Sequence, residues 1–305
     1  MGGRALVHEY NGMGPQEEMG DVLISRDVPS LSEWAEERYI LPPETAELSG
    51  PWSNDYVPYL MEPMRWLSDM ATRQVTLCAC TQSAKTELGN ILIGRTIDVN
   101  PAPTLIVMPR ENDANRRIAT RLRPMFRSTP SLLTHLGGKL DNLNIGKETI
   151  LDSMILYIAW ANSPAALADN PVCIVILDEA GKFPQSTGKE ADPYSLSKKR
   201  QRTFRTRSKL LITSSPVGEG DIFDAEFMKG DMNEWFVRDT ATGTPRKPFV
   251  HEGRYERMVC EVSLLRCLSH YETGQFEDRQ NQIGRLAPSG SLSGRGSCEI
   301  CLPGV

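Results

Sequence analysis

Short, largely apolar runs recur through the middle of the chain and alternate with longer amphipathic or polar stretches. Four runs stand out, at residues 75–80, 104–108, 172–177 and 209–213. Runs of this length are typical of strands that are buried on both faces of a parallel sheet. Because helical stretches separate them, they predict an α/β fold, with a mostly parallel sheet and helices on both of its faces.

The amphipathic stretches between the runs predict helices. Residues 30–38 begin with Ser-Leu-Ser-Glu, which predicts a capped helix with acidic residues in its first turn. A helix is expected from residue 111 to about 123, where Pro124 should end or kink it. Residues 149–160 alternate loosely and are expected to be strand-like. After residue 85, apolar residues recur at helical spacing: Leu88, Ile91, Leu92 and Ile97.

The two ends of the chain differ from its middle. Residues 1–29 are rich in Gly, Glu and Met without any period, which predicts a mobile N-terminal tail. From about residue 238 the strand-like runs vanish and Ser, Gly and Arg become frequent, so residues 238–305 are expected to be a divergent or poorly ordered tail. One folded domain is therefore expected over residues 30–237.

Composition narrows the class of protein further. The chain has 305 residues, 40% of them hydrophobic and 24% charged, which is typical of a globular protein with a substantial core. Its formal net charge of −5 argues against a chain that coats nucleic acid along its whole length, but allows local basic patches. No apolar run is long enough to span a bilayer and the N-terminus lacks a signal-peptide pattern, so a cytoplasmic protein without a membrane partner is expected. The seven cysteines, an odd number at scattered spacing, suit free thiols.

The run at residues 75–80 leads into a polar loop, Thr81-Gln82-Ser83-Ala84, and then into Lys85-Thr86-Glu87 at the start of a helical stretch. This order matches a phosphate-binding loop, in which backbone N–H groups cradle a triphosphate, the lysine reaches its β and γ oxygens and the threonine hydroxyl ligates Mg²⁺. Ala79 and Ala84 occupy both positions where the usual motif has glycine, and alanine disfavours a positive φ. Taken alone, the stretch favours an ordinary strand, turn and helix with an exposed lysine.

Two adjacent carboxylates, Asp178 and Glu179, end the run at residues 172–177. Ligands bind at the carboxyl edge of open α/β sheets, where such a pair could hold the Mg²⁺ shell through Asp178 and orient an attacking water through Glu179. A solvated acidic turn is the alternative. A third run ends at Thr213-Ser214-Ser215-Pro216, whose hydroxyls could sense a terminal phosphate or simply close a strand.

Aromatic residues and methionines are concentrated at residues 55–70, just before the first run: Tyr56, Tyr59, Met61, Met64 and Trp66. They could stack on an adenine base or form part of the core.

A basic run lies between the last two strands. Residues 198–209 contain seven lysines and arginines among twelve residues. Three interpretations stay open: a solvated face, a surface that contacts DNA phosphates, or a source of an arginine finger, with Arg200 as the candidate finger.

The order of motifs from about residue 31 to 235 resembles the ATPase domain of the large terminase subunit of tailed phages, the gpA type. Eight pieces carry the resemblance: Gly50-Pro-Trp52, the loop Thr81-Gln-Ser-Ala-Lys-Thr-Glu87, Val107-Met-Pro109 with Asn112-Asp-Ala114, Ala161-Asn-Ser-Pro164, Leu177-Asp-Glu-Ala180, Glu190-Ala-Asp-Pro193, Lys199-Arg200 with Thr203-Phe204, and Thr213-Ser-Ser-Pro216.

This resemblance implies a P-loop NTPase of the ASCE class over residues 30–237, with ATP and Mg²⁺ as its cofactors. Asp178 and Glu179 would be the metal-binding and catalytic acids. Residues Thr81 to Glu87 would form the nucleotide loop, with Thr86 also on the metal, and Ser214 would couple the nucleotide to motion. Double-stranded DNA, the terminase small subunit and the portal protein of the procapsid would be its partners, with the chain acting as a homo-oligomer on the portal in the host cytoplasm.

The resemblance also has limits. Family members continue into a metal-dependent nuclease domain, and its pattern is not recognisable here beyond residue 237. The family loop usually has glycine where this chain has Ala84, so a truncated nucleotide-binding remnant without turnover is one alternative function. A helicase-type translocase, which shares the loop and the acidic pair, is another.

Overall fold

The computed structural model describes residues 28–140, 148–168, 170–186, 191–215 and 220–235, together with the strands at 237–238, 245–246, 261–266 and 277–278. Its main sheet has the strand order β13-β9-β12-β3-β8-β7-β4-β6-β5. The five strands from β3 to β6 in this order are mutually parallel, and β5 and β12 flank them in antiparallel pairing. The predicted mostly parallel α/β sheet is therefore confirmed.

The strands of this sheet are β3 (Thr72–Cys78), β4 (Thr104–Met108), β5 (Glu148–Ile150), β6 (Ile155–Trp160), β7 (Ile174–Asp178), β8 (Lys209–Ser214), β9 (Asn233–Glu234), β12 (Glu261–Arg266) and β13 (Glu277–Asp278). Two short antiparallel pairs lie outside it: β1 (Ile40–Leu41) with β2 (Gly50–Pro51), and β10 (Val237–Arg238) with β11 (Pro245–Arg246). The α-helices are α2 (Leu31–Arg38), α3 (Met61–Ser68), α4 (Lys85–Asp98), α5 (Glu111–Arg117), α6 (Arg123–Ser128), α7 (Pro130–His135), α8 (Pro164–Ala168), α9 (Pro193–Lys199) and α10 (Ile222–Phe227).

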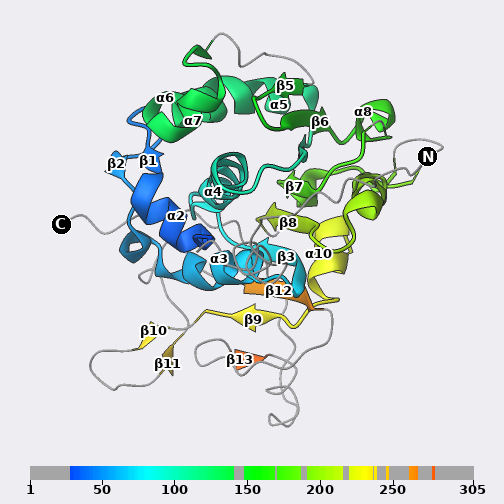
Figure 1. Cartoon of the computed structure of the whole chain (residues 1–305). Helices are drawn as coiled ribbons and strands as arrows, with labels where there is room; N and C mark the ends of the chain where they lie inside the picture. The colour runs from blue at the N-terminus through cyan, green and yellow to red at the C-terminus, as the bar shows by residue number, and fades with distance from the viewer. Residues whose placement is uncertain are drawn as a thin grey trace, which may run out of the picture.

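Alternate residues of each central strand face opposite layers of helices. In β7, Ile174 and Ile176 belong to the core under α4, whereas Val175 and Leu177 belong to a second core on the other face. Figure 1 shows α4 on one side of the strands with α2, α6 and α7 around it, and α8 and α10 on the other side. Both faces are covered, which explains why these strands are apolar at every position rather than at alternate ones.

The N-terminal helix α2 is fixed at both its cap and its packing face. Ser30 and Glu33 form a reciprocal capping box, as the sequence predicts. Trp34 is fully buried, and its indole nitrogen donates to Asp98 at the end of α4 over 2.8 Å. This helix therefore covers the central helix from the start of the described chain.

The helix expected to stop or kink at Pro124 does not stop there. It begins at Glu111 as predicted, widens into a π-helical turn over Ile118–Leu122 and continues as α6 to Ser128. Proline lacks an N–H and its ring crowds the carbonyl one turn earlier, and a widened turn accommodates both effects.

The region 149–160 divides into β5 and β6, which pair antiparallel across a short turn. Of the residues after 237, only the backbone of four strands is described, so the tail predicted for 238–305 lies mostly outside the described residues. The same holds for the tail predicted for 1–29, of which only residues 28 and 29 are described. One of these strands, β12, pairs with β3 along most of its length. This strand was missed although its sequence carries a signal: Met258, Val259, Val262, Leu264 and Leu265 form an apolar stretch like those of the central strands. The Ser, Gly and Arg content of the rest of the tail outweighed that signal.

None of the helices in the described part of the chain combines the length and apolar composition that a membrane crossing needs. Three cysteines lie among the described residues, at positions 78, 80 and 173, and all three are free thiols, as expected.

Candidate functional site: the carboxyl edge of the sheet

The carboxyl ends of β3, β8, β7 and β4 meet at one edge of the sheet. Cys78 pairs with Ser214, and Asp178 pairs with Thr213, so the loop after β3 and the acidic pair after β7 lie on either side of the end of β8. The strand that ends in the acidic pair is thus separated from the loop strand by one strand. Helix α4 begins here at Lys85, with its N-terminus directed at this edge.

The loop between β3 and α4 contains two residues in the left-handed region. Gln82 has φ 60° and Ala84, which directly precedes α4, has φ 53°. Neither is glycine, so each adopts a backbone conformation that a Cβ makes unfavourable by about 1–2 kcal/mol. Ser83 is buried, and its hydroxyl donates to the Cys80 carbonyl over 2.7 Å. Thr81 and Gln82 are exposed at the tip of the loop.

Lys85 is 6% exposed, and its ammonium group lies against the loop itself. It donates to the Ala79 carbonyl over 2.7 Å, to the Cys80 carbonyl, and to the Ser215 hydroxyl over 3.0 Å. Burial lowers the pKa of this ammonium, and the nearby Glu179 carboxylate opposes the shift. A lysine held at this place can reach an anion in the loop only by exchanging these carbonyl contacts for phosphate oxygens.

The two acids differ in their surroundings. Asp178 is buried, and one of its carboxylate oxygens, Oδ1, accepts from the Thr213 hydroxyl over 2.8 Å. Glu179 is partly exposed, has a φ of 60° and lies 2.9 Å from the Lys182 ammonium. A strained, more accessible carboxylate beside a buried, oriented one is an arrangement typical of sites where the two acids have different roles.

Ser214 and Ser215 connect these two halves through backbone and hydroxyl contacts. The Ser214 carbonyl accepts from Ala79 N–H over 3.1 Å, and its hydroxyl accepts from Gly181 N–H over 3.1 Å. Ser214 is fully buried, so its part is to join the loop to the acidic turn, whereas Ser215 carries the hydroxyl that contacts Lys85. Pro216, the next residue of the predicted coupling turn, lies outside the described residues.

A cleft of about 430 Å³ opens beside the acidic pair. Its lining includes Thr86, Asp178 and Glu179, so the structure brings together three of the residues predicted to handle the metal and the water. The remaining lining residues come mainly from β4, the helical segments that follow it and the segment before α3: Glu44, Thr45, Met108, Pro109, Asp113, Arg116, Arg117, Thr120, Arg121 and Lys182.

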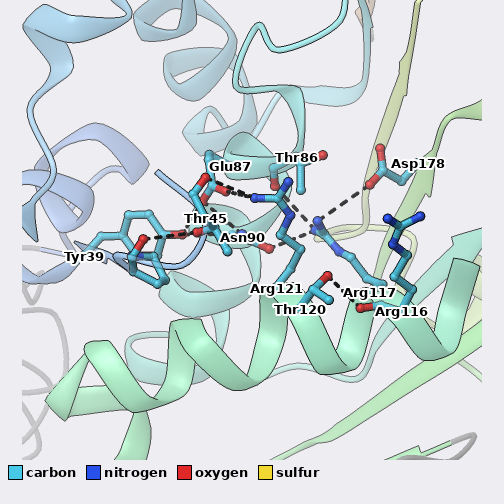
Figure 2. Close-up of polar contacts among 11 residues, drawn as sticks. Tyr39, Thr45, Thr86, Glu87, Asn90, Arg116, Arg117, Thr120, Arg121 and Asp178 are labelled. Atoms are coloured by element: carbon cyan, nitrogen blue, oxygen red, sulfur yellow. Dashed lines mark hydrogen bonds and ion pairs between the residues drawn. The ribbon is translucent and has the colours of Figure 1, made fainter. Parts of the chain in front are cut away.

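Three arginines of the cleft were not predicted from the sequence. Figure 2 shows Arg116, Arg117 and Arg121 on one helical segment, facing Thr86 and Asp178. They reach the site because β4 lies next to β7 in the sheet, so the helix after β4 starts at the same edge. The only sequence signal was a cluster of arginines in an otherwise ordinary amphipathic helix, which does not distinguish a site from a solvated face.

Arg117 is the most constrained of the three arginines and is 4% exposed. Its Nη2 donates to Asn90 Oδ1 over 2.8 Å, and its Nη1 lies 3.8 Å from Asp178 Oδ2. Neither Nη1 nor Nε has a hydrogen-bond partner. Arg117 therefore connects α4 to the metal-side acid through a short hydrogen bond on one side and a longer ion pair on the other.

Glu87 was predicted to belong to the nucleotide loop, and the structure directs it elsewhere. Its carboxylate accepts from the Tyr39 hydroxyl and from Asn90 Nδ2, and lies 3.9 Å from Arg121. Figure 2 shows these contacts extending away from Asp178 toward the N-terminal layer. The carboxylate raises the pKa of the buried Tyr39 hydroxyl, an effect that adds to the larger one of burial.

Arg200, the candidate arginine finger, is not near the cleft. Its carbonyl accepts from Val172 N–H, which places it beside the beginning of β7, at the amino edge of the sheet. Arg200 lies there because residues 193–204 form a helix and a 3₁₀ turn that end at the amino edge before β8 begins, so a finger role would have to act on a neighbouring subunit. The chain must return to that edge to start another parallel strand.

Most of the aromatic residues and methionines before β3 belong to the core. Tyr59, Met64 and Trp66 are buried in the cluster that includes α2 and α4, and Tyr56 is exposed.

The oxygen groups of the site fit a magnesium ion. Asp178 keeps Oδ2 free of hydrogen-bond donors among the described residues, and the Thr86 hydroxyl lines the same cleft. Mg²⁺ is commonly held by one or two such protein oxygens together with substrate phosphates.

Comparison with known proteins places this site in a family. The family model described as the ATPase domain of the phage terminase large subunit gpA matches residues 46–258. The terminase large subunit of Escherichia phage lambda is 25% identical over 174 residues, which cover 55% of this chain and 26% of that protein. The chain thus spans about a quarter of this relative's length.

One solved structure agrees with the fold. The large terminase of bacteriophage HK97 superposes with a TM-score of 0.51 at 16% identity, over 66% of this chain and 40% of that one. The large terminase ATPase domain of Thermus phage P74-26 gives a TM-score of 0.39 at 20% identity, over 53% and 66% of the two chains. Since the family model covers more than half of the sequence, the chain belongs to the family of phage terminase large subunits of the gpA type, in their ATPase domain.

Proposed function

We propose that this chain binds ATP and Mg²⁺ at the carboxyl edge of its sheet, hydrolyses the ATP, and uses the hydrolysis to move double-stranded DNA into a procapsid. One observation carries the proposal. The loop with Lys85 and Thr86 and the pair Asp178 and Glu179 converge at one edge, joined through the end of β8.

In this proposal the loop from Thr81 to Thr86 and the N-terminus of α4 receive the phosphates, with Lys85 moving from its carbonyl contacts to phosphate oxygens. Thr86 and Asp178 would hold Mg²⁺, which neutralises charge on the phosphates when it is bound. Glu179 orients a water molecule and accepts its proton as the water oxygen attacks the γ-phosphorus. The bond from that phosphorus to the bridging oxygen breaks, and ADP leaves with the electron pair.

The wider proposal concerns partners. We propose double-stranded DNA, a terminase small subunit and the portal as partners, with a homo-oligomer as the working form. Membership in a family of phage terminase large subunits supports a small-subunit partner and a role in packaging. We assign no nuclease chemistry to the described residues, among which no three His, Cys, Asp or Glu side chains are grouped to hold a metal.

A second candidate is nucleotide binding without turnover. Two observations favour it: Ala84 occupies the left-handed region before α4, and Lys85 is bound to backbone carbonyls of its own loop. The same measurements distinguish the two candidates.

The decisive experiment combines phosphate release with thermal unfolding. With Mg·ATP at 100 times its Kd, ligand linkage should stabilise the wild-type protein by about 2.7 kcal/mol. Lys85→Ala should lose this stabilisation. Glu179→Gln keeps shape and hydrogen bonding and should keep the stabilisation while losing phosphate release. Asp178→Asn should weaken the Mg²⁺ dependence of both measurements.

Lys139→Ala, at an exposed position outside the cleft, is the matched control for Lys85→Ala. Stabilisation of the wild type without phosphate release would select nucleotide binding without turnover. No stabilisation at millimolar Mg·ATP would contradict both candidates.

A further inference from the structure

A second concentration of charge lies at the amino edge of the sheet, at the opposite ends of the strands that form the nucleotide site. Residues 198–209 cross this edge between α9 and β8 and contain no acidic residue. Other elements add basic residues there, which the sequence did not indicate. We call the following set the amino-edge cluster: Arg73, Arg95, Lys199, Arg200, Arg202, Arg205, Arg207 and Lys209.

The register of the sheet explains why these residues meet. Gln74 pairs with Leu210, so Arg73 and Lys209 come one residue earlier on neighbouring parallel strands. Val172, just before β7, bonds to the Arg200 carbonyl, and the thiol of Cys173 contacts the Arg207 carbonyl. Arg95 lies in the last turn of α4, which runs back from the carboxyl edge.

The positive charges of the cluster are only weakly compensated. Lys209 is 9% exposed and donates to the backbone carbonyls of Asp69 and Thr72 rather than to a carboxylate. Burial, opposed by Asp69 and assisted by Arg73 and Arg95, lowers the pKa of its ammonium to about 8.

The side chains on the surface of the cluster lack partners of opposite charge. Lys199, Arg202, Arg205 and Arg207 are exposed, and within the described ranges none of them forms an ion pair. Below them, Arg73 Nη1 and Arg200 Nε are buried and have no hydrogen-bond partner. In a chain with a net charge of −5, such a local excess of guanidinium groups without ion-pair partners favours the binding of an external anion.

We propose that the amino-edge cluster is a binding surface for the phosphodiester backbone of double-stranded DNA. The exposed arginines alternate with Thr203 and Thr206, whose hydroxyls are also exposed and can donate to phosphate oxygens. Single-strand binding surfaces stack bases on exposed aromatic rings. The one aromatic residue of the run, Phe204, is half-buried beneath the Arg207 guanidinium at 5.2 Å. The chemistry therefore fits phosphates presented by a duplex better than unpaired bases.

This inference rests on the proposed function only for its partner class, and its site is separate from the nucleotide site. The cluster needs neither ATP nor Mg²⁺ to carry its charge. Binding of DNA and hydrolysis of ATP can therefore be measured independently.

The test measures the affinity of the full chain, without nucleotide, for a 30-base-pair duplex by fluorescence anisotropy over a series of NaCl concentrations. The variant is Arg202→Ala with Arg205→Ala, two exposed residues whose side chains form no hydrogen bond or ion pair among the described residues. The matched control is Arg65→Ala with Lys139→Ala, which removes the same charge at exposed positions outside the cluster.

Each lost phosphate contact lowers the slope of log affinity against log salt by about 0.9 for duplex DNA. The variant should therefore lose about 1.8 from the slope, which corresponds to a weakening on the order of fifty-fold at 0.1 M salt. The control should keep the wild-type slope. Basal ATP hydrolysis should be equal in all three proteins.

Three results would overturn the proposal: equal slopes in the variant and the control, no duplex binding by the wild type at low salt, or tighter binding of a single strand of the same length. An inactive wild-type ATPase that still shows the predicted slopes would contradict the proposed hydrolysis but support the DNA surface. An active ATPase without duplex binding would do the opposite.

Discussion

Ala84 directly precedes α4 and is the residue at which the loop departs most plainly from a glycine-containing phosphate loop. Its φ of 53° is sterically unfavourable for alanine. We expect Ala84→Gly to stabilise the protein by about 0.5–1 kcal/mol, because the relief of strain exceeds the extra entropy of glycine in the unfolded chain.

That gain corresponds to about 1–4 °C in Tm for a domain of this size, measurable by calorimetry. Ala79→Gly is the control. Ala79 is not among the described residues with a positive φ, so this substitution should destabilise. A lower Tm for Ala84→Gly would show that the left-handed conformation at this residue is not strained.

Arg117 is the residue whose role the contacts define most sharply. Arg117→Met would leave Asn90 Oδ1 without its donor and the buried Asp178 without its cation, so we expect a loss of about 3–5 kcal/mol of unfolding free energy. The loss should be smaller in Arg117→Met combined with Asp178→Asn. A double-mutant cycle by urea unfolding should give a coupling of about 0.5–3 kcal/mol.

If Arg117 positions Asp178 for the metal ion, Arg117→Met should also change how strongly Mg·ATP stabilises the protein. Mg·ATP brings a cation to Asp178, so it should stabilise Arg117→Met more than it stabilises the wild type. Arg121→Met, on the same helical face but paired with Glu87, serves as the comparison. Equal stabilisation of the wild type and Arg117→Met would reduce Arg117 to a packing residue.

At the scale of elements, α2 and α4 pack closely against each other at Gly94. Gly94 of α4 faces the Trp34 ring of α2, and a Cβ on it would lie 2.3 Å from the ring atom Cη2. We expect Gly94→Ala to destabilise by about 1–3 kcal/mol or more, because two packed helices would have to separate.

Gly89 on the same helix provides the control for this prediction. A Cβ there meets its nearest atoms at 3.6 and 3.7 Å, which is ordinary contact. Gly89→Ala should therefore stabilise α4 by about 0.5–1 kcal/mol through helix propensity. If urea unfolding gives the two alanine variants equal stability, the α2–α4 packing described here is incorrect.

At the scale of the whole molecule, the two edges of one parallel sheet carry two different chemistries. Five-residue strands such as β7 separate the cleft with Asp178 from the amino-edge cluster by about 15 Å at 3.3 Å per residue. The strands β7 and β8 run directly from one edge to the other, and both are fully buried. A shift of either strand would therefore displace residues at both edges.

This arrangement predicts how DNA acts on hydrolysis. Duplex DNA should raise the ATPase rate of the wild type, and Arg202→Ala with Arg205→Ala should lose that increase at moderate salt while keeping the basal rate. Arg200→Ala should leave the basal rate unchanged as well, since Arg200 lies at the amino edge. A large fall in the basal rate for Arg200→Ala would return it to the role of an arginine finger, acting on a neighbouring subunit.

The sequence alone determined the class of fold and most of the central strands. Runs such as 104–108 and 209–213 are apolar at consecutive positions because both faces of the sheet are covered, and that pattern is local. The loop with Lys85 and the pair at Asp178 were also predictable, since each directly follows a strand and parallel strands end at a common edge.

Only the tertiary structure decided which other residues join the site. The order of strands brings Arg117 to Asp178 from a helix some sixty residues earlier in the chain, a contact with no local sequence signal. The same order sends Arg200 to the opposite edge, although it follows the acidic pair closely in sequence. Proximity along the chain does not determine proximity in a parallel sheet, because each crossover reverses the edge at which a residue lies.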